Sequence, residues 1–110
     1  AAARPTRSGA NAAAAPLVKK SKHHNHMEFL AHGMGMVSHE APRLTDRGPV
    51  PYPAEYAAQP LESGMVVSVE TTLMHPTRGF IKLEDTVVVT DQGHEVYGEG
   101  ARGWNRAGVR

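Results

Sequence analysis

Two glutamates lie at positions where strand-like segments are otherwise apolar. Glu70 closes the run MVVSV, and Glu84 lies between the runs FIKL and TVVVT. A carboxylate inside an apolar strand costs several kcal/mol unless it is paired or binds a metal. Antiparallel neighbours lie about 5 Å apart, so both side chains can converge on one ion. We therefore predict a metal site here, and the alternative is two strand-end carboxylates that reach solvent.

Two histidines are candidate nitrogen ligands for the same ion. His32 and His39 each lie beside glycine or a small residue, in a segment with few other polar groups. A single histidine of this kind is usually a hydrogen-bonded structural residue. Two carboxylates with one imidazole suit manganese, cobalt, iron or zinc. Because this ligand set is rich in oxygen and lacks a thiolate, it indicates a hydrolytic metal and disfavours a structural zinc.

A second histidine cluster is the rival metal candidate. His23, His24 and His26 follow the basic run KKSK. Because lysines repel a cation, we interpret this cluster as part of a solvated linker, with adventitious metal binding as the alternative. His75 in a proline-flanked turn and His94 in a hairpin are expected to be exposed.

Three short runs of β-branched or apolar residues predict the strands that position the two glutamates. These runs are Met65–Val69, Phe80–Leu83 and Thr86–Thr90. Asp91–Gly93 directly follows the last run and predicts a hairpin turn, so antiparallel pairing is expected to dominate. Gly33 and Gly35 flank Met34, a pattern typical of an irregular strand or bulge where the backbone passes close to another group.

Length and composition exclude several classes of protein. The chain has 110 residues, enough for one domain at most. A net charge of +1 with 21% charged residues gives no reason to expect nucleic acid or an anionic membrane as a partner. No apolar run approaches the roughly 20 residues that a membrane helix needs. The chain has no cysteine, so disulfides are excluded and a cytoplasmic location is expected.

Low-complexity or proline-rich stretches surround the strand-rich part. Residues 1–16 consist mainly of alanine, glycine, serine and proline, and we expect a disordered tail there. Four prolines between residues 45 and 60 forbid a helix and predict an extended surface loop. The end of the chain, GEGARGWNRAGVR, is polar and glycine-rich, which indicates irregular structure in which Trp104 packs back.

Three ordered blocks resemble the motifs of the pita-bread metallopeptidases, the group of the methionine aminopeptidases, aminopeptidase P, prolidase and creatinase. AHGMGMVSHEAPRL resembles the family's His-Gly-(Ile/Met)-Gly motif with its following His-Glu. LESGMVVSVETTL resembles the motif Leu-x-x-Gly-Met-Val-x-x-(Val/Ile)-Glu. GFIKLEDTVVVTDQGHEVYG resembles the block built around Glu-Asp and Val-Thr. The blocks fall within residues 29–98, and their order and spacing make the match specific.

The resemblance implies a fold class and a set of roles. The fold would be α+β, the C-terminal half of a pita-bread fold, mainly antiparallel sheet with a flanking helix. His32 would be the imidazole ligand, and Glu70 and Glu84 the carboxylate ligands, with Glu84 bridging two metals. His39 would contact the substrate and assist proton transfer. Two divalent ions, Mn2+ first and Co2+, Zn2+ or Fe2+ as alternatives, would hold the hydroxide that attacks the scissile carbonyl.

The family also has two aspartate ligands upstream of the histidine, and they have no counterpart here. Asp46, Asp85 and Asp91 all follow His32. We therefore expect a fragment whose second metal binds weakly and whose own hydrolytic activity is poor. The expected organisation is a low-complexity or disordered segment over 1–26, the C-terminal portion of the metallopeptidase domain over 27–98, and an irregular tail over 99–110.

Two local changes indicate a branch of the family. Thr71 and Thr72 replace the common Pro-Gly, and Lys82 replaces an arginine whose bidentate contacts lysine cannot make. These changes favour an Xaa-Pro peptidase or creatinase-like relative over a methionine aminopeptidase. The predicted function is hydrolysis of a small peptide near its N-terminus, with a homodimer as an expected assembly. The alternatives are a creatinase-like C–N amide hydrolase and a non-catalytic remnant or peptide-binding module.

Overall fold

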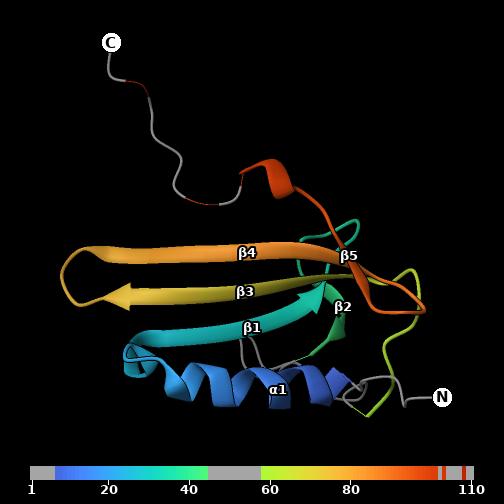
Figure 1. The fold of residues 1–110 in the computed structure, drawn as a ribbon, viewed down its shortest axis with the longest axis horizontal. Coiled ribbons are helices and arrows are strands. Elements are labelled where there is room, and N and C mark those ends of the chain that lie inside the picture. The colour runs from blue at the N-terminus through green and yellow to red at the C-terminus, as the bar shows by residue number, and fades with distance from the viewer. Residues whose placement is uncertain (1–6, 45–57, 102, 104–107, 109–110) are drawn as a thin grey trace.

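One helix and a five-stranded antiparallel sheet form the part of the chain that the computed structural model describes, residues 7–44, 58–101, 103 and 108. The long strands lie side by side, and the helix lies along β1 (Figure 1). The order of the strands in the sheet is β2-β1-β3-β4-β5. The elements are α1 (Arg7–Lys20), η1 (His24–His26), β1 (Met27–Gly33), β2 (Glu40–Arg43), β3 (Val66–His75), β4 (Gly79–Val89), β5 (His94–Val96) and η2 (Glu99–Ala101). The expected α+β class is confirmed.

The helix α1 corrects the expectation of a disordered tail over residues 1–16. Residues 1–6 lie outside the described residues, but the chain is helical from Arg7 to Lys20. Alanine has the highest helix propensity, and Lys19 and Lys20 in the last turn interact favourably with the helix dipole. These preferences outweigh Pro16 inside the helix, which removes one backbone hydrogen bond. None of the helices in the described ranges is both long enough and apolar enough to cross a membrane.

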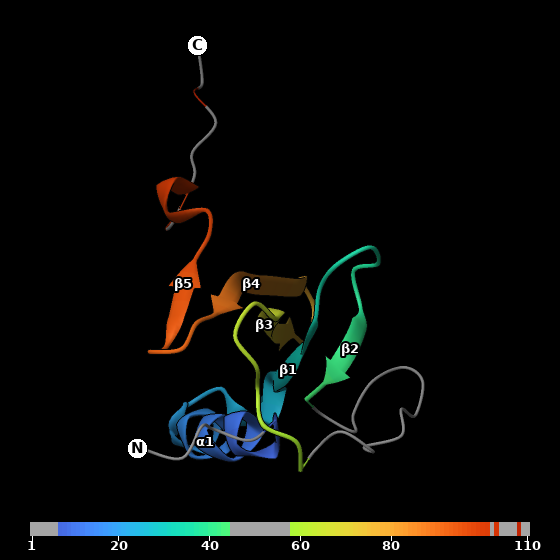
Figure 2. The same cartoon turned by 90° about the vertical axis from the view of Figure 1, so that its right-hand side faces the viewer.

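The apolar core lies on one face of the sheet. Side chains alternate between the two faces of a strand, and the buried apolar side chains of β1 and β3 come from odd-numbered positions. Ala31 of β1 and Val67 of β3 are buried together with Leu44, which follows β2. Phe29, Leu61, Val87 and Val89 pack against them. Figure 2, an end-on view of the sheet, shows α1 beside β1.

The predicted strands are confirmed, but two of them are one strand. The runs Phe80–Leu83 and Thr86–Thr90, predicted as separate strands, both belong to β4, which passes without a break through Glu84. The reason is that β4 pairs residue by residue with β3, from Gly79 opposite His75 to Val88 opposite Val66. Continuous backbone pairing outweighs the low strand propensity of two adjacent acidic residues.

The predicted hairpin turn at Asp91–Gly93 is confirmed. Val89 pairs with His94, and the Thr90 amide donates a hydrogen bond to the Gly93 carbonyl at 3.0 Å. His75 and His94 are both exposed, as expected, although His75 is the last residue of β3 and not part of the turn that follows it. Most of the predicted proline-rich loop lies outside the described residues, and so does Trp104.

Candidate metal centre

The face of the sheet opposite the core carries the predicted site. His32 of β1 lies opposite Ser68 of β3, and Glu70 of β3 lies opposite Glu84 of β4. Paired residues of antiparallel strands point to the same face, and so do residues two apart in one strand. The pairing therefore places His32, Glu70 and Glu84 on one face of three adjacent strands.

A bulge at the end of β1 sets the position of His32. The pairing of β1 with β2 shifts between His32 and Gly33. A Cβ atom on Gly33 would lie 2.7 Å from the backbone nitrogen of Pro42 and closer still to the Ala41 carbonyl. Only glycine allows this approach of β2, which confirms the predicted bulge with a close backbone contact.

His32 presents a buried nitrogen to the two carboxylates. Its Nδ1 lies 2.9 Å from the Gly33 carbonyl oxygen, which can only accept, so in the neutral ring Nδ1–H donates and Nε2 carries the lone pair. The residue is 2% exposed, and its Nε2 has no hydrogen-bond partner within the described residues. A buried lone pair that faces two carboxylates is unfavourable without a cation between them.

The distances from His32 to the two glutamates allow each glutamate to share a divalent ion with it. His32 Nε2 lies 3.7 Å from Glu70 Oε2 and 3.8 Å from Glu84 Oε1. Ligand bonds of about 2.0–2.2 Å allow two donor atoms of one ion to lie at most about 4.4 Å apart. Both distances are below that limit. Either glutamate can therefore bind the same divalent ion as His32, and the predicted closeness of His32 to both glutamates is confirmed.

Ser68 is a member of the site that the sequence prediction did not single out. It is completely buried, and its hydroxyl donates to Glu84 Oε1 at 2.5 Å. This hydrogen bond is the main cause that lowers the pKa of Glu84, and the nearby Lys82 ammonium lowers it further, while burial opposes both. The serine is the one polar residue inside the run MVVSV, two positions before Glu70, and that break in the apolar run was its sequence signal.

His39 comes to the site from the loop between β1 and β2. Its ring stacks on His32 with centroids 4.0 Å apart and planes at 22°. It is exposed, and its Nδ1 lies 3.2 Å from the Ser38 hydroxyl. One ligand atom each of His32, His39 and Glu70 lie within 4.8 Å of one another. The geometry therefore also allows His39 as a metal ligand, next to the substrate-contacting role that the resemblance implies.

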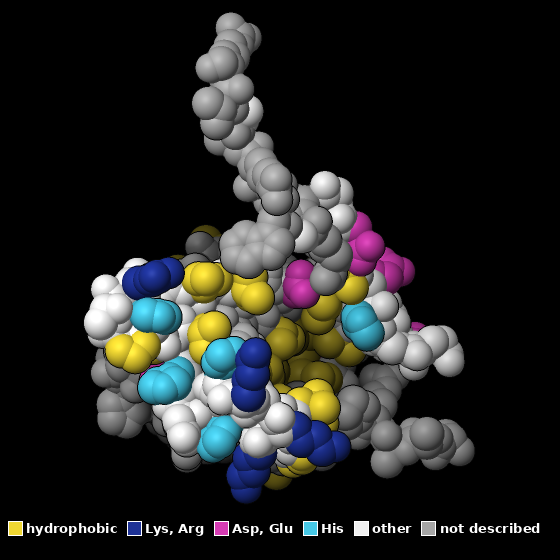
Figure 3. All heavy atoms as spheres, turned by 60° about the vertical axis from the view of Figure 1, so that its left-hand side comes forward, with side chains coloured by type: hydrophobic (Ala, Val, Ile, Leu, Met, Phe, Trp, Pro, Cys, Tyr) yellow, Lys and Arg dark blue, Asp and Glu magenta, His cyan; other side chains and the backbone are white. Residues whose placement is uncertain are grey.

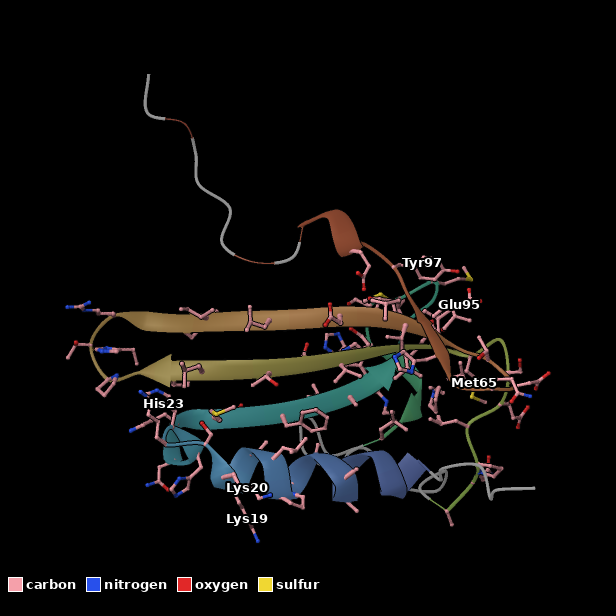
Figure 4. All side chains as sticks on the ribbon, viewed as in Figure 1. Lys19, Lys20, His23, Met65, Glu95 and Tyr97 are labelled. Carbon is pink, nitrogen blue, oxygen red and sulfur yellow. The ribbon has the colours of Figure 1, made fainter. Side chains whose placement is uncertain are left out.

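The rival cluster of histidines lies elsewhere on the molecule. His23, His24 and His26 are exposed and precede β1, whereas His32 is near the end of that strand. Figure 4 shows His23 near Lys19 and Lys20, at the opposite end of the sheet from Tyr97. Histidine, lysine and arginine side chains gather on this end of the molecule in Figure 3. The exposure and the basic surroundings of these three histidines support their interpretation as part of a solvated linker.

A comparison with protein families shows which family the chain belongs to. The model of metallopeptidase family M24 matches residues 1–91. The chain belongs to metallopeptidase family M24. The members of this family are metal-dependent peptidases, in agreement with a donor set of one imidazole and two carboxylates.

This chain aligns with only part of the length of individual M24 relatives. The Xaa-Pro dipeptidase of Pyrococcus furiosus is 34% identical over 64 residues, which is 58% of this chain and 16% of that protein. The solved prolidase of Pyrococcus furiosus aligns with a TM-score of 0.63 at 28% identity, over 86% of this chain and 26% of that one. The dipeptidase PepE of Mycobacterium ulcerans aligns with a TM-score of 0.66 at 30% identity, over 86% and 24%. The chain thus spans about a quarter or less of each relative.

Proposed function

We propose that this M24 chain supplies the His-Glu-Glu portion of the active site of an Xaa-Pro peptidase-like metallohydrolase. One observation carries the proposal: the buried Nε2 of His32, with no hydrogen-bond partner among the described residues, faces a carboxylate oxygen of Glu70 and one of Glu84. The names of the Pyrococcus relatives support a substrate with proline after the scissile bond.

The residues of the site have separate tasks in this proposal. His32, Glu70 and Glu84 hold a divalent ion, for which Mn2+ fits the oxygen-rich donor set well. A bound divalent metal lowers the pKa of water and polarises the scissile carbonyl. Ser68 keeps Glu84 ionised and in place through its hydrogen bond. The buried His32 ring is fixed by Nδ1–H donation to the Gly33 carbonyl, so that its free nitrogen stays directed at the ion.

His39 is placed to act on the substrate. Its ring is exposed while stacked on a proposed metal ligand, so one ring edge is open to a bound peptide. An imidazole at this position can donate a hydrogen bond to the peptide carbonyl or transfer a proton to the leaving amine. His39→Ala is therefore expected to reduce turnover while metal binding is kept.

The experiment that tests the function compares two forms of the protein with Mn2+ and an Xaa-Pro dipeptide. The 110-residue chain alone should hydrolyse the dipeptide poorly, because two carboxylates hold a second divalent ion weakly. Turnover should appear when the chain is joined to an upstream segment that carries two aspartates, and it should disappear in Glu70→Gln and with a chelator.

Other outcomes separate the alternatives. Turnover by the chain alone that disappears in Glu84→Gln would show a complete site within this chain or its homodimer. Hydrolysis of a C–N amide but not of Xaa-Pro dipeptides would favour the creatinase-like alternative. Peptide binding without turnover, even with the upstream segment, would contradict the peptidase proposal and favour a binding module.

A further inference from the structure

Lys82 lies inside the proposed metal site. It is on β4, two residues before Glu84 and on the same face of the sheet, opposite Thr72. Its Nζ lies 2.5 Å from Glu70 Oε2 and 3.4 Å from Glu84 Oε2. One ammonium group therefore bridges the two carboxylates that are proposed to hold the metal.

The ammonium and the metal need the same oxygen of Glu70. Glu70 Oε2 contacts Lys82, and it is also the oxygen that lies 3.7 Å from His32 Nε2. Glu84 divides its oxygens instead: Oε1 faces Ser68 and His32, whereas Oε2 faces Lys82. Competition between the two cations is therefore concentrated at Glu70 Oε2.

Charge and mobility make this competition consequential. Two carboxylates and one ammonium leave a net charge of about −1 at the site, in place of about −2 without the lysine. The Lys82 side chain is 37% exposed, on a flexible four-carbon stem, so the ammonium can leave Glu70 for solvent. A lysine beside two carboxylates stays charged at neutral pH.

We propose that Lys82 is a displaceable internal counter-ion, a positioning residue that holds Glu70 and Glu84 together and must leave Glu70 Oε2 when a divalent ion binds. This inference rests on the metal site of the proposed function. The positive charge of Lys82 offsets the electrostatic repulsion between the carboxylates of Glu70 and Glu84 when no metal is bound. Its role as a counter-ion also implies that Lys82 lowers the affinity for the metal and stabilises the metal-free site.

The test is calorimetric titration of the full chain with Mn2+. Lys82→Met should bind Mn2+ about tenfold more tightly than the unaltered chain, the change expected from removing one partly exposed ion pair and its charge. Lys82→Arg keeps the positive charge and should not tighten Mn2+ binding, because a guanidinium group also competes for the carboxylates. Arg78→Met is the matched control, because it removes a positive charge from the exposed β3–β4 turn and should change nothing.

A second measurement follows the lysine itself. Saturating Mn2+ should raise the rate at which an amine-directed reagent labels Lys82, measured by mass spectrometry against the exposed Lys22 as reference. If Lys82 had only a structural role, the ratio of the Lys82 labelling rate to the Lys22 labelling rate would not change when Mn2+ is added. Circular dichroism checks that each variant folds.

The outcomes separate this inference from the proposed function. Equal Mn2+ affinity for the unaltered chain and Lys82→Met, with unchanged labelling, would overturn the role of Lys82 and leave the metal site intact. Absence of Mn2+ binding in both proteins would overturn the metal site and the inference with it. Binding that appears only in Lys82→Met would support the metal site but overturn the displacement, because the lysine would then exclude the ion.

Discussion

Glu70 and Glu84 lie directly opposite each other on β3 and β4 and point to the same face of the sheet. Like charges directly opposite each other destabilise a pair of strands. Here the two carboxylates are separated by what surrounds them: Ser68 binds one oxygen of Glu84, and Lys82 lies between the two groups. The proposed cation site thus contains two carboxylates whose negative charge is partly compensated by Lys82.

The hydrogen bond from Ser68 should make stability depend on pH. It lowers the pKa of Glu84 below its ordinary value of 4.5. A carboxyl group whose pKa is lower in the folded state stabilises the fold above its unfolded pKa, and the contribution is lost as the pH falls through the folded pKa. Ser68→Ala should reduce the free energy of unfolding by about 1–2 kcal/mol at neutral pH and by less near pH 3. Urea unfolding at the two pH values measures both losses.

The control for this prediction is Thr86→Val. Thr86 lies opposite Ser68 in the sheet, but its hydroxyl contacts the sulfur of Met34 at 3.6 Å and no carboxylate. Its effect on unfolding should be the same at both pH values. A Ser68→Ala loss that is as large in acid as at neutral pH would contradict the linkage to Glu84.

Much of the site could be predicted because strands impose a simple geometry. Alternation of side chains and antiparallel pairing are enough to bring Glu70 and Glu84 together, once the runs around them are recognised as neighbouring strands. The inference on the two glutamates needs only local sequence and one assumption about pairing. His32 was one of two histidine candidates in the sequence, and the family resemblance distinguished it from His39.

The remaining features depend on contacts that local sequence does not encode. The stacking of His39 on His32 requires the course of the loop between β1 and β2. The bridge made by Lys82 requires the register that places β4 beside Glu70. The helix α1 was missed for a different reason: an alanine-rich composition is compatible with disorder as well as with a helix, and a nearby strand for it to lie along favours the helix.

Gly33→Ala should damage the fold and the site together. The added methyl group meets the backbone of Ala41 and Pro42, which cannot move aside as a flexible side chain can. We expect a loss of about 1–3 kcal/mol in the free energy of unfolding and weaker Mn2+ binding, because His32 is the preceding residue. Gly100→Ala is the control, since its methyl group would meet no atom within 4 Å. Equal unfolding midpoints for the two variants would contradict the close packing at the bulge.

The outer edge of β4 should promote self-association. Within the described residues, β3 pairs with one side of β4 along residues 79–88, whereas β5 pairs with the other side only over Val87–Val89. The side of β4 away from β3 therefore has no described strand beside residues 79–84. Ile81 and Leu83 on this stretch are 48% and 70% exposed. Unpaired edges with exposed apolar side chains favour pairing with other chains. Sedimentation velocity of the 110-residue chain should therefore show association that increases with protein concentration.

A charge-bearing variant tests whether this edge is responsible. Replacing both Ile81 and Leu83 by lysine should shift the chain towards the monomer. Leu17→Lys is the comparison, because Leu17 is 69% exposed but lies on α1. If Leu17→Lys reduces association as much as the double variant does, or if the unaltered chain is monomeric at all concentrations, the edge has no such role.

The most direct test of the metal centre is Mn2+ binding followed by electron paramagnetic resonance, which measures the free aqueous ion as it is taken up. The chain should bind Mn2+, and His32→Ala, Glu70→Gln and Glu84→Gln should each weaken the affinity by at least about tenfold. His39→Ala should leave it nearly unchanged, which would separate a substrate-contacting role from the ligand role that its position also allows. Combined replacement of His23, His24 and His26 by alanine should have no effect. Binding that survives in the first three variants but is lost with the His23–His26 cluster would contradict the central claim.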